Sequence, residues 1–322
     1  MVVIGCGALG THLAEYLARA GVGRLRLIDR DVVDWSNLQR QISYVERDAE
    51  ERTPKAIALA RRLAEANREV ELDVRAEDLR PENAIETCRG ADIIVDGTDN
   101  IPTRFLLNDV SLALEIPWVY GGVLRASGMV AAFSGTGGPC LRCMFPDLPP
   151  PGALPTCETA GVLGPAVGIV SGVEGVLALR ILAGASPEEI YGRLFRFDAW
   201  TLAFRTAKID PDPRCPTCAL RDYRSLAGEA SAEADVLCGR HAVQVRPARR
   251  ARSSSIGPAS GIDLAGLARR MARHGRVDER ELFIRVGLED CVVTVFRDGR
   301  AIFDGLTDPA RARSLYDLLI GE

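Results

Sequence analysis

The stretch V-V-I-G-C-G-A-L-G, residues 2–10, decides the fold of this chain. Its β-branched start predicts a buried strand, and Gly5, Gly7 and Gly10 predict a tight turn that opens a helix at residues 11–20. A second strand, L-R-L-I-D, ends at Asp29, where an acid can hold the hydroxyl groups of a ribose. This order of elements predicts a nucleotide site, but it does not distinguish NAD from ATP.

The polar stretch L-I-D-R-D-V-V-D-W-S-N-L-Q-R-Q, residues 27–41, holds more groups than a ribose site needs. A dinucleotide-binding protein requires only one acid after its second strand, and Asp29 supplies it. Asn37, Arg40 and Gln41 have no part in that task. We therefore expect this stretch to contact another part of the bound nucleotide.

Further polar groups follow other predicted elements. Lys55 opens a helix directly after a proline, and Asp99 and Asn100 follow the apolar strand A-D-I-I-V-D-G, residues 91–97. Ligands of open α/β sheets lie at the carboxyl ends of the strands. We therefore expect these three side chains to lie beside Asp29 and the glycine turn.

Two cations and an isolated aspartate favour a nucleoside triphosphate over NAD. Arg40 and Lys55 can neutralise phosphates and a departing pyrophosphate, and Asp99 can hold Mg²⁺. No Walker A lysine motif is present, so the pattern favours ATP held with its α-phosphate open to a carboxylate. The alternative is that Arg40 and Lys55 are ordinary surface cations.

Two C-x-x-C pairs, Cys140 with Cys143 and Cys215 with Cys218, predict a zinc site. Four thiolates leave no open position on the metal, so its role would be structural. Redox pairs or unrelated buried thiols remain alternatives. Cys157 follows a proline-rich stretch, residues 149–155, and precedes an apolar helix. There it can be a nucleophile or a packed apolar residue, and the pattern does not choose.

Composition bounds the class of protein. The chain has 322 residues, 47% hydrophobic content and a formal net charge of −4, which favour an ordinary globular protein without a general nucleic-acid surface. Nine cysteines and the lack of a signal peptide predict a cytoplasmic setting. The apolar residues 162–184 include Glu174 and Arg180, so we expect a buried helix and no membrane span.

The order of elements predicts three regions. Residues 1–224 form a Rossmann-like, doubly wound α/β domain with a mostly parallel sheet, antiparallel additions and the zinc knuckle. Residues 225–260 read as a linker of low order, with the first strand of the tail near 241–246. Residues 261–322 form a small α+β module with two helices and an Asp-Gly hairpin.

Six motifs in the same order as in a known family carry a resemblance: G-x-G-x-x-G, D-x-D-x-V-x-x-S-N-L-x-R-Q, P-K, T-D-N, the two C-x-x-C pairs and T-C-E-T-A-G-V-L-G-P. Over about residues 1–222 the chain resembles the ThiF/MoeB/HesA family, bacterial relatives of ubiquitin-activating enzymes. Residues 236–322, which contain C-G-R-H-A-V-Q-V and F-R-D-G-R-A-I, resemble the tail of a ThiF subset, so the ThiF branch is favoured.

The resemblance implies an adenylyltransferase that uses Mg-ATP to activate the Gly-Gly C-terminus of a ubiquitin-like sulfur carrier for thiocarboxylate formation. It implies that Asp29 holds the ribose, that Asn37, Arg40 and Lys55 hold phosphates, and that Asp99 binds Mg²⁺. Cys157 matches a cysteine that can enter sulfur chemistry. The implied partners are the carrier, a sulfur donor such as a cysteine desulfurase or rhodanese, and a second copy in a homodimer.

The chain departs from the family at its start. Family members carry a helix before the first strand, with an arginine for the partner subunit's ATP, whereas here the strand begins at Val2. We expect the reading frame to begin further upstream. The alternatives are a non-catalytic, zinc-stabilised scaffold that binds a carrier or sulfur donor, and a nicotinamide-dependent oxidoreductase, which leaves Arg40, Lys55 and Asp99 without a task. Thiamin, molybdopterin and tRNA thiolation share this chemistry, so the pathway stays open.

Overall fold

The computed structural model describes residues 1–147, 149, 157–228, 234–237, 242–246, 262–280 and 283–320; of residues 157, 158 and 234–237 it describes the backbone only. The contacts divide the chain into two units, Met1–Ala230 and Ser231–Glu322. Each unit has its own sheet, so each is described by itself.

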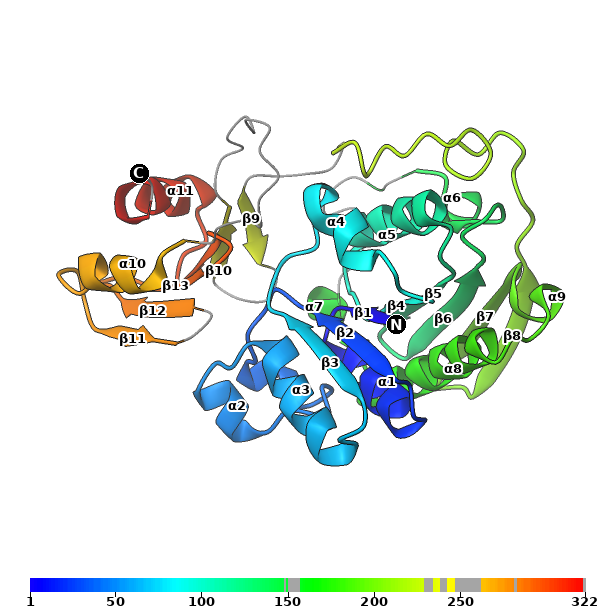
Figure 1. Ribbon diagram of the computed structural model, residues 1–322, viewed down its shortest axis with the longest axis horizontal. Coiled ribbons are helices and arrows are strands. Elements are labelled where there is room, and N and C mark those ends of the chain that lie inside the picture. The colour runs from blue at the N-terminus through cyan, green and yellow to red at the C-terminus, as the bar shows by residue number, and fades with distance from the viewer. Residues whose placement is uncertain are drawn as a thin grey trace. The chain divides into compact units, whose positions relative to one another are not determined.

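The first unit is built on an eight-stranded sheet of order β3-β2-β1-β4-β5-β6-β7-β8 (Figure 1). The parallel strands are β1 (Val2–Ile4), β2 (Arg24–Ile28), β3 (Glu71–Arg75), β4 (Ile94–Asp96) and β5 (Trp118–Leu124). The antiparallel strands are β6 (Ser127–Phe133), β7 (Arg193–Asp198) and β8 (Ala203–Lys208). The predicted parallel sheet with antiparallel additions is confirmed.

Helices cover both faces of this sheet (Figure 1). Side chains alternate along β1, so Val3 enters one apolar core while Val2 and Ile4 enter the other. The first core is covered by α1 (Ala8–Arg19), α3 (Lys55–Ala66) and α8 (Gly164–Leu182). The second is covered by α4 (Pro81–Cys88), α5 (Ile101–Leu114) and α6 (Leu141–Met144). Shorter helices are η1 (Trp35–Asn37), α2 (Glu46–Glu50), α7 (Cys157–Ala160) and α9 (Pro187–Ile190).

Helix α8 has the length and composition of a membrane span, and 44% of its most apolar window is buried inside the unit. It packs against α1, β5 and β6, which accounts for the apolar residues on its inner side. On the other side Val176 and Leu182 are exposed. Among the described residues, α8 is thus a core helix with one uncovered apolar side.

The turn between β5 and β6 lies earlier than the sequence suggested. The segment V-L-R-A-S-G-M-V-A-A-F, residues 123–133, predicts two strands with a turn near Ser127-Gly128, but the chain reverses at Arg125, which has a left-handed φ of 56°. Gly128 already pairs with Val123 in the ladder. A β-carbon at Gly128 would overlap the ring of Phe197, so this glycine serves close packing and does not form the turn.

The second unit is a six-stranded antiparallel sheet of order β11-β12-β13-β14-β10-β9. Its strands are β9 (Ala234–Leu237), β10 (Ala242–Val245), β11 (Val277–Glu279), β12 (Phe283–Gly287), β13 (Val292–Phe296) and β14 (Ala301–Asp304). Helices α10 (Leu264–Met271) and α11 (Pro309–Leu319) pack on the face that carries Val243, Val293 and Phe303. Strand β9 lies in the stretch that we expected to be a linker.

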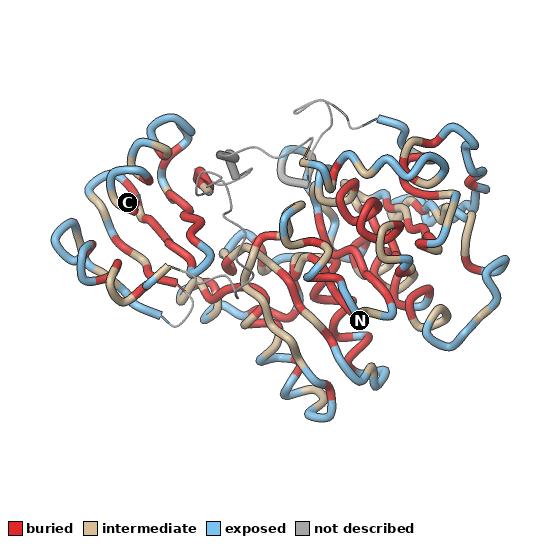
Figure 2. The backbone as a smooth tube through the Cα atoms, turned by 45° about the horizontal axis from the view of Figure 1, so that its top comes forward, coloured by how far each residue is buried: buried red, intermediate tan, exposed pale blue. Residues whose placement is uncertain are grey.

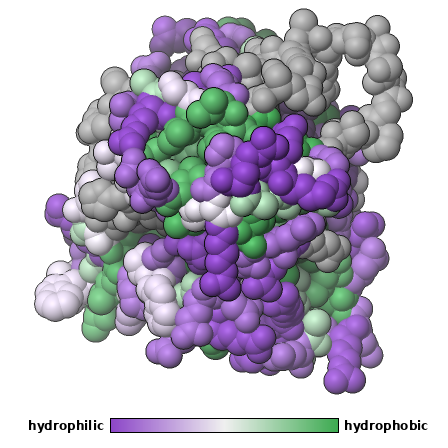
Figure 3. Space-filling model, turned by 90° about the vertical axis from the view of Figure 1, so that its left-hand side faces the viewer, coloured by the Kyte–Doolittle hydropathy of each residue, from purple (hydrophilic) through white to green (hydrophobic). Residues whose placement is uncertain are grey.

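Buried residues run along the central strands of both sheets and along the inner sides of the helices that pack on them (Figure 2). On the face of the protein shown in Figure 3, hydrophilic residues cover much of the surface, and hydrophobic residues form patches between them.

Candidate nucleotide site and metal centre

The glycine turn between β1 and α1 contains two glycines that the fold itself requires. Gly5 has a φ of +87°, and a β-carbon there would lie 2.7 Å from the backbone of Gly97. A β-carbon at Gly10 would overlap the carbonyl oxygen of Gly5. Gly7 differs, because the nearest protein atom to its β-carbon would be the Gly97 oxygen at 3.8 Å. The fold does not need a glycine at position 7, so the space there is available to a ligand.

The same turn leaves the N-terminus of α1 open. No side chain caps this 12-residue helix at Gly7, and its first turn contains no acidic residue. The first N–H groups of a helix have no partner inside it, and the helix dipole favours an anion at this end. The turn can therefore hold a phosphate group beside Gly7.

Asp29 lies directly against the glycine turn. Its carboxylate accepts hydrogen bonds from the backbone N–H groups of Cys6 and Asp31, both at 2.6 Å. Burial raises the pKa of Asp29. The positive charge of Lys55 opposes this shift, and the negative charge of Asp31 adds to it. Two hydroxyl donors, such as those of a ribose, would stabilise this carboxylate.

Lys55 is buried, with 6% of its surface exposed, and its ammonium group lies 3.1 Å from a carboxylate oxygen of Asp31. The hydroxyl group of Tyr44 lies 2.6 Å from the carbonyl oxygen of Cys6 and 3.1 Å from that of Lys55. Tyr44 therefore links the glycine turn to the first residue of α3. Sequence reasoning missed Tyr44, since a lone tyrosine in an irregular segment carries no motif.

The segment of residues 37–41 lies next along this edge. Asn37 is buried and accepts a hydrogen bond from the N–H of Asp34 at 3.1 Å, so it stabilises its own turn. Arg40 donates to the carbonyl oxygen of Ser36 at 3.0 Å and makes no ion pair within the described part of the chain. Gln41 is 3% exposed, and its side-chain oxygen has no hydrogen-bond partner among the described residues.

The segment after β4 carries Asp99. Asp96 accepts hydrogen bonds from both the N–H and the hydroxyl group of Thr98, at 2.8 and 2.6 Å. A β-carbon at Gly5 would lie 3.0 Å from the nitrogen of Thr98, so this segment touches the glycine turn. Asp99 is exposed, and Asn100 caps α5 by accepting from the N–H of Thr103 at 2.9 Å. The ligand roles of Asp99 and Asn100 remain predictions.

Arg104 holds this segment from behind, and sequence reasoning missed it. Its guanidinium group donates to Asp96 at 3.1 Å and to the carbonyl oxygens of Thr98 and Gly121, both at 2.7 Å. It also lies over the ring of Tyr120, 5.1 Å from the centroid. An arginine in the first turn of a largely apolar helix was the only available signal.

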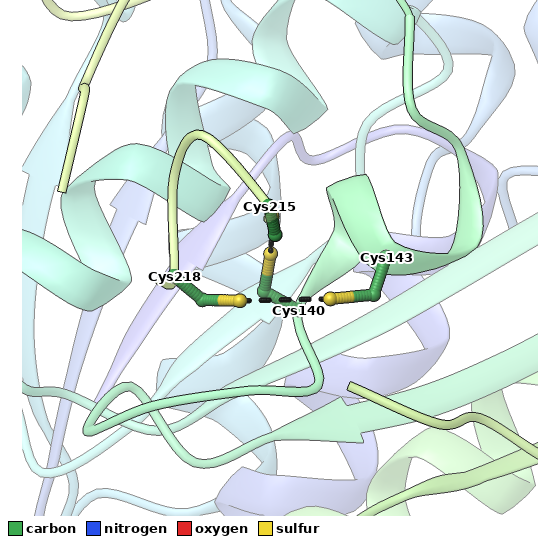
Figure 4. Close-up of side chains that lie close together, drawn as sticks. All are labelled: Cys140, Cys143, Cys215 and Cys218. Carbon is green, nitrogen blue, oxygen red and sulfur yellow. Dashed lines mark hydrogen bonds between the residues drawn. The ribbon is translucent and has the colours of Figure 1, made fainter. Parts of the chain in front are cut away.

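Four cysteines converge on one point between α6 and the loop before residue 219 (Figure 4). Their sulfur atoms lie within 4.8 Å of one another, and the pairs Cys140–Cys215 and Cys143–Cys218 are 3.6 and 3.5 Å apart. Four thiolates around Zn²⁺, with Zn–S bonds of about 2.3 Å, have sulfurs separated by about 3.8 Å. The cluster therefore fits a tetrahedral zinc ion.

Groups around the cluster match a structural thiolate site. The side-chain amide of Asn108 lies 3.7 Å from the sulfur of Cys140, and the N–H of Asp212 lies 3.4 Å from that of Cys143. Such donors stabilise thiolates and orient the ligands. The side chain of Cys157 and most of the proline-rich stretch before it lie outside the described residues, so the role of Cys157 remains a prediction.

Comparison with known proteins gives consistent matches. The ThiF family matches residues 1–217. A sulfur carrier protein ThiS adenylyltransferase from Bacillus subtilis is 40% identical over 99% of this chain and 92% of its own length. A sulfur carrier protein adenylyltransferase from Thermus thermophilus is 39% identical over 71% of this chain and 88% of its own. An adenylyltransferase and sulfurtransferase from Anopheles gambiae is 35% identical over 73% of this chain and 54% of its own.

Solved structures show the same fold. The crystal structure of Escherichia coli MccB with MccA-N7isoAsn superimposes with a TM-score of 0.59 at 19% identity, covering 68% of this chain and 66% of that one. At this level of identity the likeness concerns the fold alone.

Proposed function

The chain belongs to the ThiF family, and on this premise we propose that it is an ATP-dependent adenylyltransferase for a ubiquitin-like sulfur carrier protein. A carboxylate oxygen at the Gly-Gly end of the carrier forms a bond to the α-phosphorus of ATP. The bond from that phosphorus to the bridging oxygen of the β-phosphate breaks, and pyrophosphate leaves. The product is an acyl-adenylate that a sulfur donor can convert into a thiocarboxylate.

The buried Lys55 is the observation that carries this proposal. Its ammonium group is held by Asp31, whose N–H binds the carboxylate of Asp29. NAD needs an aspartate for its ribose but no buried cation beside it. A reaction that expels pyrophosphate does need one, because negative charge develops on the leaving group.

The other residues of this edge have complementary tasks. Asp29 would hold the ribose, and the free N–H groups at Gly7, together with Asn37, Arg40 and Gln41, would hold phosphate oxygens. Asp99 is exposed at the same edge and would hold Mg²⁺, with Asn100 beside it. When bound, this ion neutralises phosphate charge. The four cysteines Cys140, Cys143, Cys215 and Cys218 would hold zinc in a purely structural role.

A ThiS-like carrier is favoured over a MoaD-like one. The Bacillus protein matches 99% of this chain and therefore includes the second unit, whereas the Thermus protein matches 71%. The thiolate of Cys157, at the start of α7, would attack the acyl carbon of the carrier adenylate, forming a thioester as the bond to AMP breaks and AMP leaves. A cysteine desulfurase or rhodanese would supply the sulfur.

A docking surface for the carrier is available at the turn between β7 and β8. Asp198 pairs with Ser127 next to the end of β5, so this turn lies at the carboxyl edge of the sheet, as Asp99 does. Trp200, Leu202 and Phe204 expose 81%, 76% and 65% of their surfaces there. Exposed apolar groups of this size mark interaction sites, and they suit the hydrophobic face of a folded carrier.

A second copy of the chain would cover the outer side of α8. A groove of about 510 Å³ along this helix is lined by Gly172, Val176, Arg180 and Phe195, among others. Small and apolar residues allow close approach of a symmetric partner. We therefore propose a homodimer that packs through α8.

Exchange of labelled pyrophosphate into ATP tests the proposed function. We expect exchange that requires both Mg²⁺ and a Gly-Gly-ended carrier, and that Asp99→Ala abolishes. Asp92→Ala, in an exposed position at the other end of β4, is the matched control and should behave as the wild type. Carrier binding without exchange would instead favour a non-catalytic scaffold, and exchange that persists in Asp99→Ala would remove Asp99 from the metal role.

A further inference from the structure

Glu174 lies in the interior of α8 with no part in the reaction described above. It is fully buried, and neither of its carboxyl oxygens has a hydrogen-bond partner among the described residues. Its carboxyl group occupies the space over Gly121, where a β-carbon would overlap it. An acid placed this deep without a partner is costly unless it is neutral.

The groups that face Glu174 come from three elements. The charges that act on it are Asp96 at the end of β4 and Arg104 in α5. Tyr120 in β5 is also close, because the negative charge of Glu174 raises the pKa of its hydroxyl group. Strand β6 has no titratable side chain. Helix α1 brings His12 and Tyr16 to other positions of α8, and α9 brings Glu189, which pairs with Arg180.

Burial in this setting favours the neutral acid. Desolvation raises the pKa of Glu174 well above its usual range, the charge of Asp96 raises it further, and Arg104 opposes the shift. Asp96 and Arg104 already form an ion pair at 3.1 Å. A second carboxylate beside this pair would leave one negative charge uncompensated in the interior.

Arg104 connects this interior to the site at the sheet edge. It donates to the carbonyl oxygen of Thr98, the residue before Asp99, and to that of Gly121, against which Glu174 packs. If Glu174 became charged, it would compete with these carbonyl oxygens for the guanidinium group. The backbone that carries Asp99 would then lose the hydrogen bond that fixes it.

We propose that Glu174 is a positioning residue for the adenylation site, which in its neutral form fills the space behind Gly121 and leaves Arg104 to hold the Thr98–Asp99 backbone. This inference rests on the proposed function, because it assigns to Asp99 the binding of Mg²⁺. Glu174 touches neither nucleotide nor metal in this scheme. It acts only through Arg104.

The Mg²⁺ requirement of the full chain tests this proposal. Glu174→Ala opens a cavity behind Gly121 and should raise the Mg²⁺ concentration for half-maximal pyrophosphate exchange at least fivefold at pH 7. Glu174→Gln mimics the neutral acid, so its Mg²⁺ concentration for half-maximal exchange should stay close to that of the wild type. Glu189→Gln, with the same change at a site where the side chain is 61% exposed, is the matched control. A denaturant unfolding curve, measured for each variant, verifies that the variant is folded.

A pH series supplies a readout that packing alone would not change. The Mg²⁺ requirement of the wild type should increase on the alkaline side, and that of Glu174→Gln should stay constant there. Parallel curves for the two proteins, or a Gln variant as impaired as the Ala variant, would overturn the proposal.

Calorimetry of Mg-ATP binding to the same variants separates the two hypotheses. If the wild type binds Mg-ATP but shows no carrier-dependent exchange, the proposed function fails, and the binding data alone decide the role of Glu174. If exchange proceeds and the Glu174 pattern is absent, only the positioning role fails. If no Mg-ATP binds at all, both fail.

Discussion

The hydroxyl group of Tyr44 lies 2.6 Å from the carbonyl oxygen of Cys6, inside the glycine turn. Burial raises the pKa of Tyr44 well above its ordinary value, so the hydroxyl keeps its proton and donates it. Tyr44→Phe removes this donor and leaves a buried carbonyl oxygen unpaired. We expect a loss of about 1–3 kcal/mol in the free energy of unfolding and a raised KM for ATP. Denaturant titration and steady-state exchange measure both. Tyr16→Phe, in a 40% exposed position, should change neither, and equal losses in the two variants would rule out the link.

Lys55→Ala should lower kcat/KM for ATP by about 10²–10³-fold, because a charge held beside a leaving pyrophosphate is removed. The measurement is carrier-dependent pyrophosphate exchange at varied ATP concentration. Lys208→Ala is the matched control, since this lysine is exposed on β8 and its only ion pair within the described part of the chain is with Asp210. A Lys55→Ala protein that retains full exchange would contradict the phosphate role, while one that fails to fold would be recognised by its unfolding curve.

The cysteine cluster should contain one zinc ion per chain, measurable by elemental analysis. Cys143→Ser should abolish this content and lower the free energy of unfolding by about 3 kcal/mol in zinc at a hundredfold excess over its dissociation constant. Cys88→Ala alters a buried thiol outside the cluster and should retain the metal. Full zinc content in Cys143→Ser would show that the zinc ion is bound at another site.

Trp200→Ser should raise the KM for the carrier about tenfold or more and leave the KM for ATP unchanged, because a docking surface acts on one substrate only. Leu318→Ser, on α11 of the second unit and 76% exposed, is the control for a change of surface hydrophobicity. Equal effects on the two KM values would point to a folding defect and against docking.

Glu174 predicts a distinctive dependence of stability on pH. Its pKa is raised in the folded state, so its contribution is fully present below the unfolded value of 4.5 and declines as pH rises. The decline approaches about 1.4 kcal/mol per pH unit until the folded pKa is reached. Glu174→Gln should therefore become increasingly more stable than the wild type from pH 5 to pH 8. A difference that does not change with pH would show that Glu174 is charged in the fold.

Short motifs with a local cause were predictable from the sequence. The glycine turn follows from backbone geometry at Gly5 and Gly10, and the two C-x-x-C pairs announced a cluster even though 75 residues separate their partners. Gly128 shows the limit of this reasoning. The ring of Phe197 leaves no room for a β-carbon at this position, but in sequence the residue looks like a turn glycine.

Residues whose importance depends on tertiary contacts were not predictable. Tyr44, Arg104 and Glu174 lie in ordinary local sequence, and their partners come from other elements of the fold. In sequence, Glu174 argues only against a membrane span. A buried acid in an apolar helix is visible in sequence, but the pair that it faces is not.

The chain contains two lysines, Lys55 and Lys208. One is buried in the candidate nucleotide site and the other is 80% exposed on an edge strand. Acylating reagents will therefore modify Lys208 first, and an amine-reactive nucleotide analogue can be directed to Lys55. Peptide mapping of one labelled protein then reports occupancy of the nucleotide site against an internal standard in the same molecule, without any enzymatic assay.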